Sequence, residues 1–167
     1  TGKRMLNFVD NHDVIRAYTA LKEKRDLLNL YTLLFTMPGI PCVYYGSEFG
    51  AEGDKSDLDY KLRPFIGDID KTKHPELVGH IKKLAAIRRS SRALSYGTYQ
   101  KATIMNRNFS FIRECDGERV IVAINIEDHD CTIRVEEAEG TDLLTGQVRN
   151  LNDIYLPPFT ASIYRRY

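Results

Sequence analysis

The sequence has little of several features that would assign it to a particular class of protein. It contains three cysteines and no tryptophan in 167 residues. Cys42, Cys115 and Cys131 are odd in number and fall at no metal-ligand spacing, so neither a disulfide framework nor a zinc site is predicted. An apolar run of about 18 residues, which a membrane-spanning helix needs, is also missing. We therefore expect no membrane association.

Charge of one sign is equally scarce. Lys and Arg number 24 and Asp and Glu 23, which leaves a net charge of +1. A nucleic-acid-binding protein carries a basic stripe or patch, so no nucleic-acid partner is expected. Three cysteines without an evident pairing favour the cytoplasm. The chain starts at Thr1 with an apolar, strand-like run instead of a leader, and we expect the natural N-terminus to be missing.

The first part of the chain alternates strand and helix. Met5–Val9 is a short apolar run typical of a strand buried on both faces. Apolar residues then recur at helical spacing over 27–35, and Met37-Pro38-Gly39 ends that helix. Ile40–Tyr45 is a second apolar run, and Pro75 opens a second helix. This order is typical of a parallel α/β sheet or barrel, although a complete (β/α)₈ barrel takes roughly 250 residues.

From Tyr96 onward the pattern changes to alternation with a period of two. Apolar side chains on both sides flank Asp116-Gly117, a dipeptide that favours a tight hairpin turn. We predict a small antiparallel β-sandwich over residues 95–167, after an α/β part over residues 1–94. Its later strands are expected at Cys131–Val135, Thr141–Leu144, Gly146–Val148 and Ala161–Tyr164.

One cluster of polar residues follows the first strand directly. Asn11, His12 and Asp13 lie just past its C-terminal end, where the catalytic residues of α/β barrels collect. A carboxylate beside an imidazole can transfer protons, bind a metal or hold sugar hydroxyls. The alternative is a turn in which Asn11 and Asp13 cap backbone amides.

Two longer motifs place this cluster in a known context. The first is Phe8-Val9-Asp10-Asn11-His12-Asp13. It resembles the fourth conserved sequence region of the α-amylase family (glycoside hydrolase family 13), where a Phe opens the seventh barrel strand and Asn-His-Asp ends it. The second is Gly39-Ile40-Pro41-Cys42-Val43-Tyr44-Tyr45-Gly46-Ser47-Glu48, which looks like the eighth strand of the same family.

The resemblance implies a fold for the whole chain. Residues 1–94 would be the seventh and eighth strands of a (β/α)₈ barrel with their helices, and residues 95–167 the antiparallel β-sandwich that follows the barrel. The expected fold class is therefore α/β plus all-β: an incomplete barrel fragment followed by a β-sandwich.

The resemblance also implies roles for single residues. Asp13 matches the family's third carboxylate, which holds hydroxyls of the sugar being cleaved and stabilises an oxocarbenium-like transition state. His12 matches a substrate-binding imidazole, and Asn11 belongs to the motif that positions both. Arg63 lies in a segment similar to a loop of oligosaccharide-cleaving members, and it either reaches a sugar or fixes the loop through an ion pair. Glu48 either faces the substrate or anchors its loop.

Neither a metal site nor a cofactor is expected. The acidic loop of Asp54, Asp57 and Asp59 does not follow the EF-hand pattern, so we predict a solvated loop. Adjacent Tyr44 and Tyr45 must point in opposite directions if they lie in a strand, where one stacks on a sugar or both pack in the barrel. Three histidines have no partner that the sequence identifies, namely His74, His80 and His129.

The expected function is that of one part of an enzyme. The parent would be an α-glucan-active retaining glycoside hydrolase or transglycosylase that cleaves α-glucosidic bonds in starch-derived oligosaccharides. A retaining mechanism needs a nucleophilic carboxylate and a carboxylic acid about 5 Å apart. The family places these on strands four and five, which this chain lacks, so the chain alone is expected to be inactive.

The sequence also offers an alternative function and an expectation about assembly. The alternative function is a non-catalytic scaffold or carbohydrate-binding member of the same family, and the lack of Trp argues against sugar binding by the sandwich alone. Two parallel strands taken from a barrel have open edges and an uncovered face. We therefore predict that the chain self-associates through the open barrel edge.

Overall fold

The chain folds into two compact units. The computed structural model describes residues 4–55 and 59–167. Unit 1 comprises the chain up to Phe35 together with Gly39–Leu84, and unit 2 comprises Thr36–Pro38 together with Ala85–Tyr167. The predicted domain division at residue 94 stays a prediction. Within the described ranges, no helix has both the length and the apolar character needed to cross a membrane.

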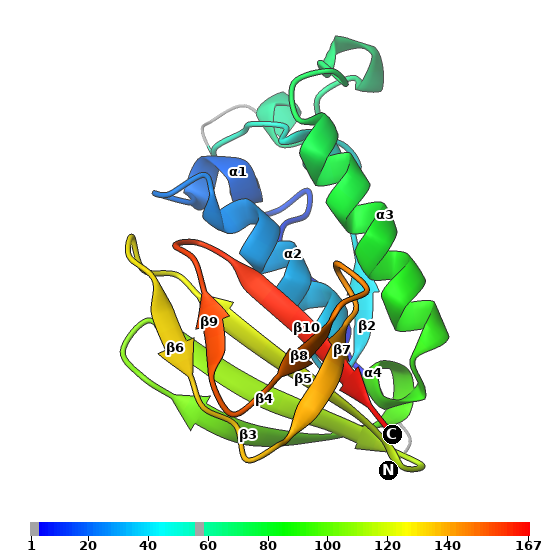
Figure 1. Ribbon diagram of the computed structural model, residues 1–167. Coiled ribbons are helices and arrows are strands. Elements are labelled where there is room, and N and C mark those ends of the chain that lie inside the picture. The colour runs from blue at the N-terminus through cyan, green and yellow to red at the C-terminus, as the bar shows by residue number, and fades with distance from the viewer. Residues whose placement is uncertain (1–3, 56–58) are drawn as a thin grey trace. The chain divides into compact units, whose positions relative to one another are not determined.

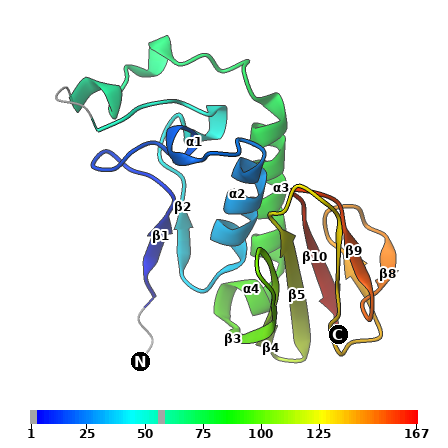
Figure 2. The ribbon, with the colours of Figure 1, turned by 90° about the vertical axis from the view of Figure 1, so that its left-hand side faces the viewer.

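Unit 1 is built on two short parallel strands. β1 (Leu6–Phe8) and β2 (Ile40–Cys42) lie side by side, with Leu6 opposite Ile40 and Phe8 opposite Cys42 (Figure 2). Both are shorter than the apolar runs that predicted them, because only these three residue pairs form the ladder. Three single 3₁₀ turns follow β2, namely η1 (Ser47–Phe49), η2 (Asp59–Lys61) and η3 (Ile66–Asp68).

The prediction that these strands are buried on both faces is wrong for this chain. Leu6 is 58% exposed, Phe8 46% and Ile40 49%. Leu6 and Phe8 project from the same face of β1 because they are two residues apart, and Ile40 is the neighbour of Leu6. Among the described strands, β1 pairs only with β2, so nothing in the sheet covers this apolar strip.

Helices provide most of the core of unit 1. α1 (Ala17–Ala20) is a single turn, and α2 (Asp26–Thr36) buries the predicted positions Leu27, Tyr31 and Leu34. α3 (Pro75–Ser90) begins at the predicted proline, whose missing N–H is not needed in a first turn. After α2, Gly39 has φ +117°, and a Cβ there would lie 2.8 Å from the Met5 carbonyl oxygen. Only glycine fits this connection to β2.

Unit 2 is an antiparallel sandwich of two layers. The larger sheet has the strand order β3-β4-β5-β10-β7-β8, and the pair β6-β9 lies over one face of it (Figures 1 and 2). α4 (Arg92–Tyr96) precedes β3 and packs against β4 and β5. The strands are β3 (Thr98–Ile104), β4 (Asn108–Cys115), β5 (Glu118–Asn125), β6 (Cys131–Ile133), β7 (Glu139–Asp142), β8 (Val148–Asn150), β9 (Ile154–Leu156) and β10 (Ala161–Arg166).

The predicted hairpin is present between β4 and β5. Asp116 and Gly117 form a two-residue turn with φ values of 52° and 81°, the left-handed conformation that such turns require. Apolar residues from both layers meet in one core. Its fully buried members include Ile121 on β5, Ile133 on β6 and Leu156 on β9.

Strand positions late in the chain differ from the prediction. The predicted strands Thr141–Leu144 and Gly146–Val148 are interrupted by a turn that Asp142 organises. Its carboxylate accepts hydrogen bonds from the Leu144 amide and the Thr145 hydroxyl, each at 2.8 Å. These local hydrogen bonds replace pairing between strands at this point, so β7 ends at Asp142 and β8 begins only at Val148. β9 was not predicted from the sequence.

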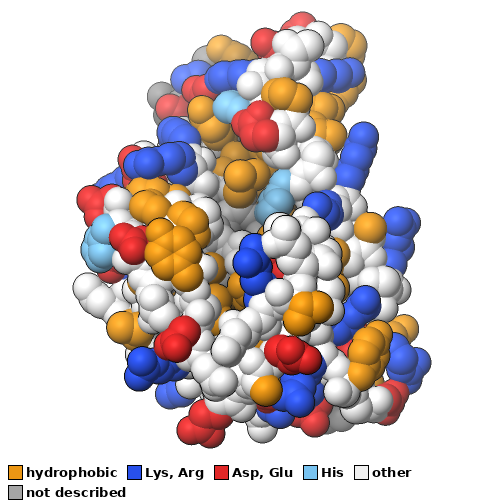
Figure 3. Space-filling model, viewed as in Figure 1, with side chains coloured by type: hydrophobic (Ala, Val, Ile, Leu, Met, Phe, Trp, Pro, Cys, Tyr) orange, Lys and Arg blue, Asp and Glu red, His pale blue; other side chains and the backbone are white. Residues whose placement is uncertain are grey.

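Unit 2 also contains a buried guanidinium. The Arg113 side chain on β4 donates hydrogen bonds to the carbonyl oxygens of Thr36, Gly97 and Thr98, at 2.6, 2.9 and 2.9 Å. These bonds hold the segment after α2 and the start of β3 to the sheet. On the face drawn in Figure 3, basic and acidic side chains are interspersed, in keeping with the net charge of +1.

Candidate functional site

The cluster after the first strand forms an exposed turn in unit 1. The Asp13 amide donates to the Asn11 side-chain oxygen at 2.8 Å, so Asn11 caps the turn. The His12 Nε2 lies 3.2 Å from one carboxylate oxygen of Asp13, and the two side chains are 50% and 66% exposed. The turn that Asn11 caps therefore also presents the imidazole of His12 and the carboxylate of Asp13 to solvent.

Arg63 joins this pair from a distant part of the sequence. Its Nη2 lies 3.6 Å from the other carboxylate oxygen of Asp13. The structure thus brings together all four site residues expected from the sequence: Asn11, His12, Asp13 and Arg63. Arg63 makes the ion pair that the sequence offered as one alternative. Because its side chain is 40% exposed, it also faces the solvent in which a ligand would lie.

Tyr44 and Tyr45 do not behave as neighbours in a strand. β2 ends at Cys42, so both tyrosines lie outside the strand and the condition for opposite orientation is not met; their rings contact each other with centroids 4.7 Å apart. The Tyr45 hydroxyl donates to the Pro64 carbonyl oxygen at 2.8 Å, which holds the segment of Arg63. The Tyr44 ring lies 6.3 Å from the His12 ring between centroids. Burial raises the pKa of Tyr44 above its ordinary value, and a hydrogen bond to Tyr45 adds to this.

A buried polar network lies at the base of the turn, and sequence reasoning missed it. The Asp10 carboxylate accepts hydrogen bonds from the Ser47 hydroxyl at 2.6 Å and from the Ala17 amide at 2.9 Å. The Arg16 Nε lies 3.6 Å from the same carboxylate. The sequence contained a signal of this network. Asp10 lies at the end of an apolar strand and Arg16 lies three residues after Asp13. Charged residues in such places are costly to bury unless they pair with each other.

The neighbourhood of Asp10 also affects a tyrosine on α2. Tyr31 is fully buried, and this burial raises the pKa of its hydroxyl well above its usual range. The Asp10 carboxylate is the second cause, because a negative charge nearby opposes formation of a phenolate. Tyr31 is therefore a neutral member of the core and not an acid or base for chemistry.

The loop after β2 contains an open hollow of about 760 Å³. Arg63 is on its wall, together with the exposed rings of Tyr60 and Phe65, which are 63% and 72% exposed. Asp54, also on the wall, pairs with Lys61 at 3.4 Å. Asp57 lies outside the described residues. Glu48 is in η1, with one carboxylate oxygen buried and without a hydrogen bond among the described residues.

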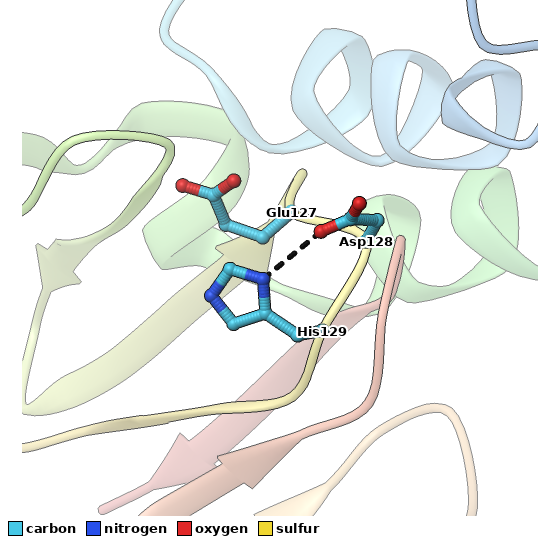
Figure 4. Close-up of side chains that lie close together, drawn as sticks. All are labelled: Glu127, Asp128 and His129. Carbon is cyan, nitrogen blue, oxygen red and sulfur yellow. Dashed lines mark hydrogen bonds and ion pairs between the residues drawn. The ribbon is translucent and has the colours of Figure 1, made fainter.

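The three remaining histidines have partners that sequence reasoning did not identify. In unit 1, His74 lies 3.1 Å from a Glu76 oxygen, and His80 Nε2 lies 2.8 Å from the Thr32 hydroxyl. In unit 2, His129 Nδ1 lies 3.0 Å from an Asp128 oxygen (Figure 4). The partners of His74 and His129 lie within two residues of them in the sequence, whereas Thr32 is 48 residues from His80 and is brought to it only by the fold.

Glu127, Asp128 and His129 form one compact group in the loop after β5. One possible ligand atom of each lies within 4.8 Å of the others. Asp128 and His129 are exposed and bonded to each other, which lowers the pKa of Asp128 and raises that of His129. Because this hydrogen bond accounts for their proximity, the group needs no metal to explain it.

Comparison with known proteins identifies the family of this chain. The sequence profile "Alpha amylase, catalytic domain" matches residues 1–90, which include the turn and Arg63. The chain belongs to the α-amylase family. The matched range includes both motifs on which the resemblance was based, and the roles of the single residues in them stay predictions.

Individual relatives resemble 72% to 96% of this chain. Cyclomaltodextrinase of Thermoanaerobacter pseudethanolicus is 33% identical over 96% of this chain and 28% of the relative. Cyclomaltodextrin glucanotransferase of Bacillus sp. (strain 38-2) is 34% identical over 72% of this chain and 16% of the relative. The debranching enzyme of Nostoc punctiforme is 26% identical, with a TM-score of 0.81 over 95% of this chain and 35% of that one. The chain thus spans about a third or less of each.

Proposed function

We propose that this chain is the C-terminal part of an α-glucan-active retaining glycoside hydrolase or transglycosylase. The whole enzyme would cleave α-glucosidic bonds in starch-derived oligosaccharides. In it, residues 1–94 would complete a (β/α)₈ barrel as its seventh and eighth strands with their helices, and residues 95–167 would be the following β-sandwich. The observation that carries the proposal is the convergence of His12, Asp13 and Arg63 beyond the end of β1 in a chain of this family.

The exposed Asp13 carboxylate suits the role of a transition-state stabiliser. Cleavage of a glycosidic bond builds positive charge at the anomeric carbon, and a fixed carboxylate lowers the energy of that charge. Carboxylate oxygens also accept hydrogen bonds from sugar hydroxyls. His12 and Arg63 contact the same carboxylate at 3.2 and 3.6 Å, so they hold its position and offer donors of their own to the sugar.

The hollow beside Arg63 supports a substrate longer than one sugar. Its volume of about 760 Å³ accommodates sugar rings, and exposed Tyr60 and Phe65 offer apolar faces for them. Its walls carry both acidic and basic side chains, which fits a neutral, hydroxyl-rich ligand better than an ionic one.

We infer that the 167 residues have no glycosidase activity alone. A retaining mechanism uses two carboxyl groups about 5 Å apart, one as nucleophile and one as acid and base. The family resemblance assigns both to strands that precede this segment. Asp13, His12 and Arg63 would then bind and stabilise the sugar, while the bond-breaking groups come from the rest of the polypeptide.

The test is kinetic and uses the full polypeptide that carries these residues. Asp13→Asn keeps the shape of the side chain but removes its charge, and we expect it to lower kcat/KM on maltoheptaose by about 10³-fold, a loss typical of one electrostatic transition-state contact. Glu136→Gln, at an exposed acidic residue in unit 2, serves as the control and is expected to retain activity. Full activity of Asp13→Asn would contradict the proposal. A full polypeptide that binds maltoheptaose without cleaving it would support the scaffold alternative.

A further inference from the structure

A fully buried cation lies in unit 1 beside the candidate site. Arg16 is 0% exposed, and Asp10, its ionic partner, is 1% exposed. The Arg16 Nε and Nη1 make no hydrogen bond among the described residues. A buried guanidinium with unused donors is costly for a protein to keep.

Arg16 contacts the segment that follows β2. Its Nη2 donates to the Tyr45 carbonyl oxygen at 2.6 Å, and its guanidinium lies 4.6 Å from the centroid of the Tyr44 ring. A cation over an aromatic face is attracted to it, more so when both are removed from water. Gly46 leaves room for this arrangement, because a Cβ there would lie 3.0 Å from Nη2, and its φ of +84° also favours glycine.

Asp10 and Arg16 also enclose the functional turn in the sequence. Asp10 precedes Asn11, and Arg16 follows Asp13 by three residues. The Asp10 carboxylate binds the Ala17 amide and the Ser47 hydroxyl, so both ends of the 11–15 segment are attached to one buried network. His12 and Asp13 project from this segment into solvent and have no core packing to position them.

We propose that Arg16 is a positioning residue for the reaction assigned above. It fixes the Tyr44 ring, which lies beside the His12 ring, and with Asp10 it sets the place of the His12–Asp13 turn relative to Arg63. Lysine can replace it only in part, because an ammonium group keeps the charge but lacks the planar face that lies over Tyr44 while an edge bonds to the Tyr45 carbonyl. This inference rests on the proposed function.

The test separates positioning from folding. In the full polypeptide, Arg16→Met is expected to lower kcat on maltoheptaose by about 10²-fold, because small displacements of catalytic groups cost that much. KM should change by less than about threefold, since the side chain does not touch the substrate. Arg16→Lys, which keeps the charge beside Asp10, is expected to recover only part of kcat.

Arg113→Met is the matched control. Arg113 is also buried, 1% exposed, and also binds carbonyl oxygens, but it lies in unit 2. It should lower stability and leave kcat of the folded enzyme unchanged. If Arg16→Met does not fold, Tyr44→Leu is the variant that tests the inference. Loss of the Tyr44 ring should lower kcat, and an unchanged kcat overturns the inference.

Two results overturn the inference about Arg16. One is a kcat within about twofold of wild type in folded Arg16→Met, and the other is an equal loss of kcat in Arg113→Met. The activity of Asp13→Asn distinguishes a wrong inference about Arg16 from a wrong proposed function. If Asp13→Asn is inactive and Arg16→Met is not, only the positioning role is wrong. If Asp13→Asn is fully active, the proposed function itself is wrong.

Discussion

β5 in unit 2 and β1 in unit 1 differ in how far their apolar residues are buried. On β5 in unit 2, every residue from Val120 to Asn125 is buried. On β1 in unit 1, Leu6 and Phe8 are about half exposed. Both strands are rich in apolar side chains, but β5 has a hydrogen-bonded neighbour on each side and β1 pairs with β2 alone among the described strands.

The difference concerns how each unit obtains a core. The sandwich closes its core with its own strands, since β6 and β9 supply Ile133 and Leu156 opposite Ile121 of β5. Within residues 4–55 and 59–167, the parallel pair has no second layer of strands to do this. Parallel strands are found almost only where both faces are covered. The apolar strip of β1 and β2 is therefore typical of a surface that other parts of a barrel would cover.

Truncation of one apolar side chain in each unit should give the largest contrast in stability. Ile121→Ala removes buried methyl groups from the sandwich and should lower the free energy of unfolding of unit 2 by about 2–5 kcal/mol. Leu6→Ala, at a residue that is 58% exposed, should change stability by less than about 0.5 kcal/mol. Urea unfolding followed by circular dichroism measures both. Equal losses would mean that the exposed strip is packed in solution.

Self-association should reveal the uncovered strip directly. We expect the isolated chain, of 19.2 kDa, to sediment as dimers or larger species, because β1 and β2 expose apolar side chains beside an open edge. The double substitution Leu6→Lys and Ile40→Lys should restore a monomer, since buried ammonium groups would oppose the contact. Val148→Lys, at a 64% exposed residue of β8, should have no effect. A strictly monomeric wild-type profile in analytical ultracentrifugation would disprove the expectation.

The smallest expected effect is the pH dependence that buried His80 gives to the stability of unit 1. Burial lowers the pKa of His80 below its ordinary value of 6.5, and the charge of Lys83 acts in the same direction. The folded state therefore prefers neutral His80, so stability is fully present above about pH 6.5 and is lost as the pH falls towards the folded pKa.

Urea unfolding at about pH 7.5 and about pH 5.5 measures this loss, and the range brackets the ordinary titration of histidine. His80→Gln replaces the ring N–H near Thr32 with an amide N–H that does not titrate. It should make the stability of unit 1 less dependent on pH over that range. Ile121→Ala, in unit 2, should retain the dependence. If His80→Gln leaves the dependence unchanged, another group is responsible.

Local patterns predicted many elements of the fold. The helix at Pro75 and the hairpin at Asp116-Gly117 were predictable because a proline in the first turn and a left-handed dipeptide act within a few residues. The positions of β7 and β8 were not, because the Asp142 side chain competes with the ladder. β9 was missed because its three residues form a strand through their pairing with β6, which lies more than 20 residues earlier in the chain.

For the candidate site, the sequence by itself determined the turn. Asn11, His12 and Asp13 are adjacent, and a side-chain cap two residues away is enough to shape them. Only the tertiary structure decided that Arg63 meets Asp13, that Arg16 lies under Tyr44, and that Asp10 is buried with Ser47. These contacts join residues far apart in the chain, and their energies depend on burial. A sequence shows which residues are charged or aromatic, but burial and distance arise only when the chain folds.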